Sequence, residues 1–200
     1  HEIKHIGWAR AREGRHRVDV VFGAHPHELA GTAQNLVHQC LVWFIDGGAG
    51  NDHIKGGAGD DNLNGNSGRD FIQGDTGNDT IHGGTGRDLV AGGAGNDNFG
   101  GGSDNDVLSG NAGNDTLNGG TGTDKLIGGT GNDTYVVDSV SDVVRETSTL
   151  GSEIDTVLSS VTFTLSANLE RLTLSGSGAL NGTGNGLANV LTGNTGANKL

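Results

Sequence analysis

The strongest constraint on this chain is a nine-residue repeat that runs ten times without a change of register, from Gly47 to Val136. Position one is always glycine, position six is always aspartate and position eight is always a large apolar residue. Position four is glycine in nine units, and Asp104 is the exception. Written from position one, the units are GGAGNDHIK, GGAGDDNLN, GNSGRDFIQ, GDTGNDTIH, GGTGRDLVA, GGAGNDNFG, GGSDNDVLS, GNAGNDTLN, GGTGTDKLI and GGTGNDTYV. Such a short fixed period predicts a stack of similar structural units.

Each repeated position has a local physical reason. Glycine at positions one and four permits positive φ and close backbone packing, which predicts a turn over the first six residues. Asp104 fits this turn because aspartate is among the few residues enriched in left-handed conformations. The last three residues predict a short strand whose middle side chain points to one face. The apolar residues then form one inward-facing column, and successive coils stack about 4.8 Å apart as parallel strands.

The composition excludes several classes of protein. The 200 residues include 39 glycines and one proline, only 32% are apolar, and the net charge is −12. Low hydrophobicity with high charge usually predicts disorder, so the repeat must supply the order. The acidic balance argues against a nucleic-acid partner, because phosphates would repel it. Cys40 is the single cysteine and cannot form an internal disulfide, and the longest apolar run, Leu41 to Ile45, is too short to span a bilayer.

The position-six aspartates are the candidate metal ligands. If two repeats make one coil, alternate aspartates stack on one face about 5 Å apart and repel by roughly 3 kcal/mol per pair. That repulsion would unfold a domain whose total stability is typically about 5–15 kcal/mol, unless a cation lies between the neighbours. Carboxylate and carbonyl oxygens in flexible loops suit calcium better than zinc, copper or magnesium. The ten aspartates are Asp52, Asp61, Asp70, Asp79, Asp88, Asp97, Asp106, Asp115, Asp124 and Asp133.

These units resemble the nonapeptide GGxGxDxUx of RTX (repeats-in-toxin) proteins, the haemolysin-type calcium-binding repeats. The resemblance implies a right-handed parallel β-roll with two repeats per coil, in which the aspartates and glycine carbonyls of loops two repeats apart would hold each ion. About eight interior sites would result. It also implies a bacterial protein that the type I secretion machinery exports and that folds outside the cell. The implied carbonyl ligands are Gly48, Gly50, Gly57, Gly59, Gly68, Gly77, Gly84, Gly86, Gly93, Gly95, Gly113, Gly122 and Gly131.

The chain divides into four segments. Residues 1–46 contain no nonapeptide and are of unclear nature, and within them Ala33 to Ile45 fits either a helix or a buried strand. Residues 47–136 form the roll, and residues 137–181 predict a strand-rich cap or spacer. In this part of the chain, strands are expected over 134–138, 142–146, 155–165 and 169–175. Residues 182–200 begin a degenerate second repeat block, where Asn189 and Asn198 replace aspartate and metal binding should be weak or absent.

The first five residues fit the zinc motif H-E-x-x-H, with His1 and His5 as ligands and Glu2 as general base. Secreted zinc proteases of the serralysin type carry RTX repeats behind such a motif. This chain departs from their extended motif at Trp8 and Ala11, and it has no methionine for the Met-turn. We therefore expect a chain without enzymatic activity.

Three functions remain in view from the sequence. The first is a secreted, extracellular calcium-binding module that folds on export and supports a neighbouring domain. The second is a fragment of an RTX-bearing enzyme, either a protease or another hydrolase or epimerase. The third is a surface adhesin arm. The activity of the parent protein and the oligomeric state stay open.

Overall fold

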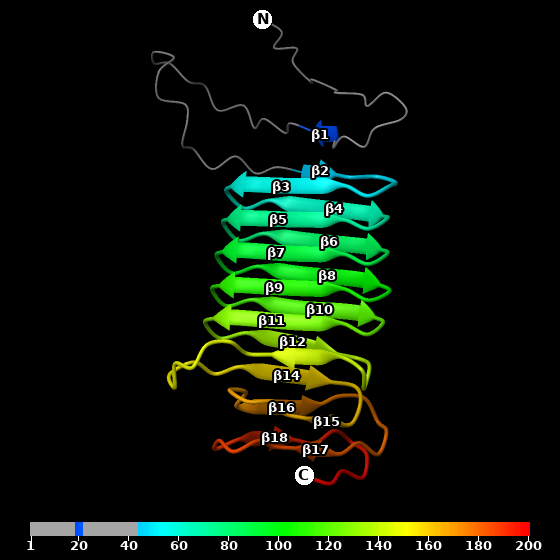
Figure 1. Ribbon diagram of the computed structural model, residues 1–200. Coiled ribbons are helices and arrows are strands. Elements are labelled where there is room, and N and C mark those ends of the chain that lie inside the picture. Colours follow the sequence, from blue (N-terminus) through cyan, green and yellow to red (C-terminus); the bar gives the residue numbers. More distant parts are fainter. Residues whose placement is uncertain (1–18, 22–43) are drawn as a thin grey trace, which may run out of the picture.

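The computed structural model describes residues 19–21 and 44–200. Within them every regular element is a β-strand, and the strands stack along one axis, with the C-terminal coil at the opposite end from β2 (Figure 1). The described residues contain no helix that could cross a membrane. The HEIKH motif and residues 33–43 lie outside the described residues. The predicted all-β parallel roll is confirmed.

Two parallel sheets form the two walls of the roll. The ten-stranded sheet has, in spatial order, β1 (Asp19–Val21), β2 (Phe44–Asp46), β4 (Asn62–Ser67), β6 (Thr80–Thr85), β8 (Asn98–Ser103), β10 (Thr116–Thr121), β12 (Thr134–Val137), β14 (Thr156–Ser159), β16 (Arg171–Leu174) and β18 (Val190–Thr192). Only β1 runs antiparallel to its neighbour. The six-stranded sheet has β3 (His53–Ala58), β5 (Phe71–Thr76), β7 (Leu89–Ala94), β9 (Val107–Ala112), β11 (Lys125–Thr130) and β13 (Val143–Arg145).

Consecutive strands alternate between the two walls, so two repeats make one coil, as predicted. Within one wall the paired residues are 18 apart, as in Leu63 with Ile81 and Ile54 with Ile72. The strands are longer than the sequence predicted, because they run over six residues from position seven into position three of the next unit. Glycine and other small residues at these positions keep pairing across coils, as in Gly57 with Asp75. The predicted six-residue turn is therefore wrong, and the turn occupies positions four to six.

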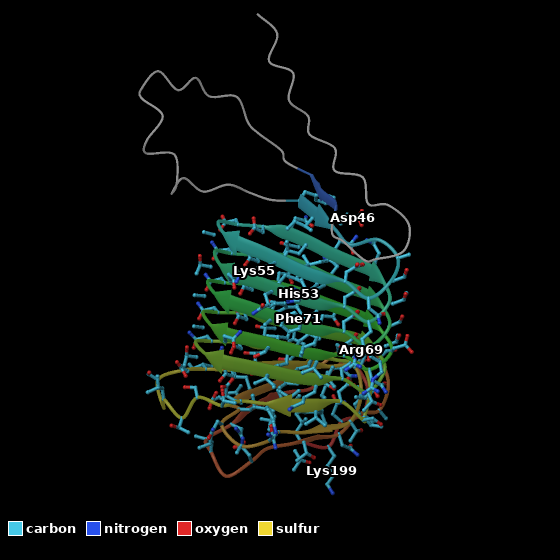
Figure 2. All side chains as sticks on the ribbon, turned by 45° about the horizontal axis from the view of Figure 1, so that its top comes forward. Asp46, His53, Lys55, Arg69, Phe71 and Lys199 are labelled. Carbon is cyan, nitrogen blue, oxygen red and sulfur yellow. The ribbon has the colours of Figure 1, made fainter. Side chains whose placement is uncertain are left out.

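The ten position-eight residues form the predicted inward column, and none is more than 2% exposed. The column continues beyond the repeats through Val144, Val157 and Leu172. Outward-facing residues pair with the neighbouring coil instead. The rings of His53 and Phe71 stack with centroids 4.8 Å apart, and Lys55 Nζ lies 3.0 Å from an Asp75 carboxylate oxygen (Figure 2).

The chain after the last repeat continues the same roll. Strands β14, β16 and β18 extend the ten-stranded sheet in register, with Tyr135 beside Val157 and Leu172 beside Leu191. The strand predicted over 155–165 is split into β14 and β15 (Phe163–Thr164), and β15 pairs with β17 (Gly182–Thr183) in a separate sheet. The split follows from a local turn, in which the Ser159 hydroxyl donates to the Val161 carbonyl and accepts from the Val161 amide.

A truncation in the column tests its contribution. Leu117 is fully buried, and Leu117→Ala should lower the free energy of unfolding of the calcium-loaded chain by about 2–5 kcal/mol, because the coil cannot refill the cavity. Leu89 is 44% exposed, and Leu89→Ala should cost less than about 1 kcal/mol. Urea unfolding followed by circular dichroism measures both. Equal losses from the two variants would contradict a core made of this column.

Candidate calcium-binding loops

The position-six aspartates form two continuous hydrogen-bonded ladders, one along each side of the roll. In each ladder, Oδ1 of one aspartate accepts a hydrogen bond from the backbone amide of the aspartate one coil earlier, as from Asp88 N–H to Asp106 Oδ1 at 2.8 Å. All ten aspartates are at most 6% exposed. The predicted stacking of Asp52, Asp70, Asp88, Asp106 and Asp124 on one side, and of Asp61, Asp79, Asp97, Asp115 and Asp133 on the other, is confirmed.

The second carboxylate oxygen, Oδ2, is the unusual feature of these ladders. It is buried and accepts no hydrogen bond in Asp52, Asp70, Asp79, Asp88, Asp97, Asp106, Asp115, Asp124 and Asp133. A buried charged oxygen without a partner costs several kcal/mol, so native proteins almost always pair such atoms. The repetition of this feature in coil after coil indicates a ligand that binds to these oxygens.

A backbone carbonyl accompanies Oδ2 in seven of the ten loops. A Cβ placed on Gly83 would lie 2.5 Å from Asp88 Oδ2 and 2.6 Å from the carbonyl oxygen of Gly101, which is the position-one glycine of the next coil. At Gly101 the same construction meets Asp106 Oδ2 at 2.6 Å and Gly119 O at 2.5 Å. The missing side chain at position one therefore leaves a small space that a carboxylate and a carbonyl oxygen both border.

Burial raises the pKa of the ladder aspartates from Asp70 to Asp133, and the backbone N–H that donates to each Oδ1 only partly offsets that effect. Neighbouring aspartates on the same ladder raise it further in the middle of the roll. The pKa reaches about 7 for Asp106 and Asp133 and about 6 for Asp88, Asp97 and Asp115. Without a cation, these aspartates therefore bind protons more tightly in the folded roll than in the unfolded chain.

The donor set fits calcium. The polar groups that border the space at position one are all oxygens, and the carboxylates supply formal negative charge. Hard divalent cations with six to eight oxygen ligands bind in this way, whereas zinc and copper favour nitrogen or sulfur. A bound cation would neutralise the two aspartate ladders.

Comparison with known proteins agrees with this geometry. The family model for the RTX calcium-binding nonapeptide repeat (4 copies) matches residues 44–72, 64–99 and 100–135. The repeat block belongs to the RTX calcium-binding repeats. Neither the curated proteins nor the solved structures contain a significant match to this chain.

The glycines expected to supply carbonyl ligands to the RTX loops stand at positions two and four of the repeat. All thirteen have positive φ, as Gly86 does at 114°, and where the next coil has a glycine at the same position the carbonyl points at it, as Gly68 O does at Gly86. Asp104 replaces glycine at position four with a φ of 79°, as the sequence predicted. The carbonyls that border the aspartate oxygens belong to position one, which the sequence reasoning did not select. The choice among these carbonyls stays a prediction.

Both ladders continue past the last RTX unit, which the sequence reasoning missed. Asp124 N–H donates to Asp142 Oδ1 at 3.1 Å, and Asp133 N–H donates to Asp155 Oδ1 at 2.7 Å. Asp142 keeps the 18-residue spacing and could have been found by counting, whereas Asp155 comes after 22 residues.

A further type of ladder, exposed to solvent, is formed by the position-five asparagines. In it the Asn114 N–H donates to Asn96 Oδ1 at 2.7 Å. Asparagine at position five in six of the ten units was its signal.

In the degenerate repeats at the C-terminal end, uncharged asparagine side chains take the place of the aspartates and bond to the backbone. Asn189 Oδ1 accepts the Asn185 amide, and Asn189 Nδ2 donates to the Leu169 carbonyl at 2.8 Å. Asn198 Nδ2 likewise donates to the Leu180 carbonyl at 2.9 Å. The amide N–H groups supply the positive partner that the aspartate loops lack. That these two positions bind metal weakly or not at all stays a prediction.

Acid should partly replace the cation. The folded roll keeps protons on these aspartates at pH values where the unfolded chain, with aspartate pKa values near 3.8, has lost them. Their contribution to metal-free stability is therefore complete below about pH 3.8 and is lost as the pH rises through about 6 and 7. Chelated protein should therefore gain β signal in circular dichroism when the pH is lowered from 8 to about 5.

The calcium-loaded chain is the control, and it should show the opposite trend because protons compete with the ion for the carboxylates. An equal β signal at both pH values in chelator would contradict the assignment of the raised pKa values to the ladders.

Proposed function

We propose that this chain is a secreted calcium-binding module whose roll folds only when calcium neutralises its two aspartate ladders. The observation that carries the proposal is the row of buried Oδ2 atoms without hydrogen-bond partners, most of them beside a position-one carbonyl. The core alone is thin, because each strand contributes a single buried apolar side chain from position eight. Cation binding and folding are then one event.

A calcium-dependent fold suits a protein that must cross a membrane unfolded. Calcium is scarce in the cytosol, and extracellular calcium modules bind at about 10⁻⁴–10⁻³ M. The chain stays unfolded before export, because the ladders repel, and folds outside, where calcium is abundant. RTX repeats are typical of secreted proteins, which supports export through a type I system and a role in supporting a neighbouring domain. The protease alternative depends on His1, Glu2 and His5, which lie outside the described residues, and it stays a prediction together with the adhesin arm.

A titration tests the proposed function. Far-UV circular dichroism should show a cooperative gain of β signal as calcium rises from chelator to about 10 mM, the range of extracellular modules. Magnesium is the matched control and should have little effect, because it needs a stricter octahedron and loses its water reluctantly. A chain that is fully folded in chelator at neutral pH, or that ignores calcium, would refute the proposal.

One substitution separates the ladder charge from the overall charge. Asp97 lies in the middle of a ladder, and Asp97→Asn keeps an oxygen for the Asp79 amide while it removes one charged ligand. The calcium concentration at the midpoint of the titration should rise by about 10-fold or more, because changes to the groups around a bound metal typically lower its affinity by at least that factor.

Asp60→Asn is the control, because it removes the same charge at exposed position five, where asparagine is common and already accepts the equivalent hydrogen bond. Its midpoint should stay close to that of the parent chain. Similar shifts in both variants would show that only net charge matters.

A further inference from the structure

Three acidic side chains meet where the last repeat joins the following coil. One carboxylate oxygen from each of Asp133, Glu146 and Asp155 lies within 4.8 Å of the other two. Asp133 and Asp155 are 1% exposed and Glu146 is 9% exposed. Only Asp133 belongs to a nonapeptide, since Glu146 follows β13 and Asp155 precedes β14. Three buried carboxylates at this distance repel one another unless something positive lies among them.

Oxygens of Asp133 and Glu146 border the small space beside Gly128. Asp133 Oδ2 is buried and accepts no hydrogen bond. A Cβ placed on Gly128 would contact Asp133 Oδ2 and the Tyr135 hydroxyl, and it would lie 2.7 Å from Glu146 Oε2. In the preceding coils the equivalent space is bordered by the carbonyl of the residue 18 positions later, as at Gly101 with Gly119. Glu146 stands 18 residues after Gly128, so a charged carboxylate replaces that neutral carbonyl.

Hydrogen bonds hold the three carboxylates in place. Glu146 Oε1 accepts the Ser148 amide at 2.7 Å, and Glu146 Oε2 accepts the Tyr135 hydroxyl at 2.7 Å. Asp155 Oδ1 accepts the Asp133 amide, and the Asp155 amide in turn donates to Glu170 Oε2 at 2.9 Å. Within residues 44–200 the only ion pair is Lys55–Asp75, so no basic side chain of that range neutralises the cluster.

We propose that Asp133, Glu146 and Asp155 form a terminal site for a hard divalent cation, with calcium the best fit, that is distinct from the repeat loops and joins the roll to its C-terminal cap. The ligands are carboxylates from three different turns of the chain, so binding there fixes β12, β13 and β14 relative to one another. Calcium affinity rises with the number of charged ligands. This site should therefore fill at lower calcium than a repeat loop.

Tyr135 provides a specific signal for this site, because it is the only tyrosine of the chain and its hydroxyl contacts the cluster. Terbium prefers oxygen ligands as calcium does, and it emits when a nearby excited tyrosine transfers energy to it. The full chain should show tyrosine-sensitised terbium emission that saturates first in a titration and that calcium displaces. Subtracting the emission of Tyr135→Phe removes any contribution from the two tryptophans.

Glu146→Gln tests the cluster itself. It should weaken the first terbium phase by at least about 10-fold while the later calcium-induced gain of β signal remains. Glu170→Gln is the matched control, because it makes the same change on a carboxylate that supports Asp155 from outside the cluster, and its first phase should stay within a few-fold of the parent. Unchanged first-phase affinity in Glu146→Gln would overturn the proposal.

The unsubstituted chain offers a second test that does not require a variant to fold. An anomalous difference map of terbium-loaded crystals should show a peak among Asp133, Glu146 and Asp155, and no peak there would overturn the site. If instead the repeat loops do not bind calcium, the β signal should not change with calcium while the tyrosine-sensitised emission persists. That result would contradict the proposed function and leave the terminal site intact.

Discussion

The whole roll depends on the burial of negative charge at fixed intervals. In each ladder one oxygen of every aspartate from Asp70 onward is held by a backbone amide, while the other faces a small space beside a position-one glycine. The hydrogen bond joins neighbouring coils and the glycine leaves space beside the carboxylate, so under the proposed function the same residue both builds the stack and binds the cation. The apolar column cannot replace that contribution, since it contains one side chain per strand.

The C-terminal coils show what the roll looks like when the charge is absent. Asn189 and Asn198 keep an oxygen near the place of the aspartate oxygen, and their own N–H groups bond to carbonyls of the preceding coil. Stacking of this backbone therefore does not itself require metal. Under the proposed function, calcium dependence comes from the aspartates, and the repeat block would be a switch that the asparagine coils lack. The cluster of Asp133, Glu146 and Asp155 lies where the first kind of coil gives way to the second.

Much of this structure could be predicted from the sequence, because each coil contacts only its neighbours and the period is constant. Counting by 18 placed every repeat aspartate on its ladder and every position-eight residue in the column. The length of the strands was missed, since glycines at positions one and two were taken for turn residues although their backbones pair. Glu146 and Asp155 were missed because four extra residues interrupt the spacing between Asp133 and Asp155, and only the folded chain shows that all three meet.

Hydrogen exchange of the ladder amides would show whether the aspartate ladders form only with calcium. The amides of Asp88 and Asp97 each donate to the carboxylate one coil further on, so their exchange reports whether that contact exists. At neutral pH these amides should be strongly protected from exchange with calcium and should exchange rapidly in chelator. Equal protection in both conditions would show that the ladders form without a cation and would contradict the account.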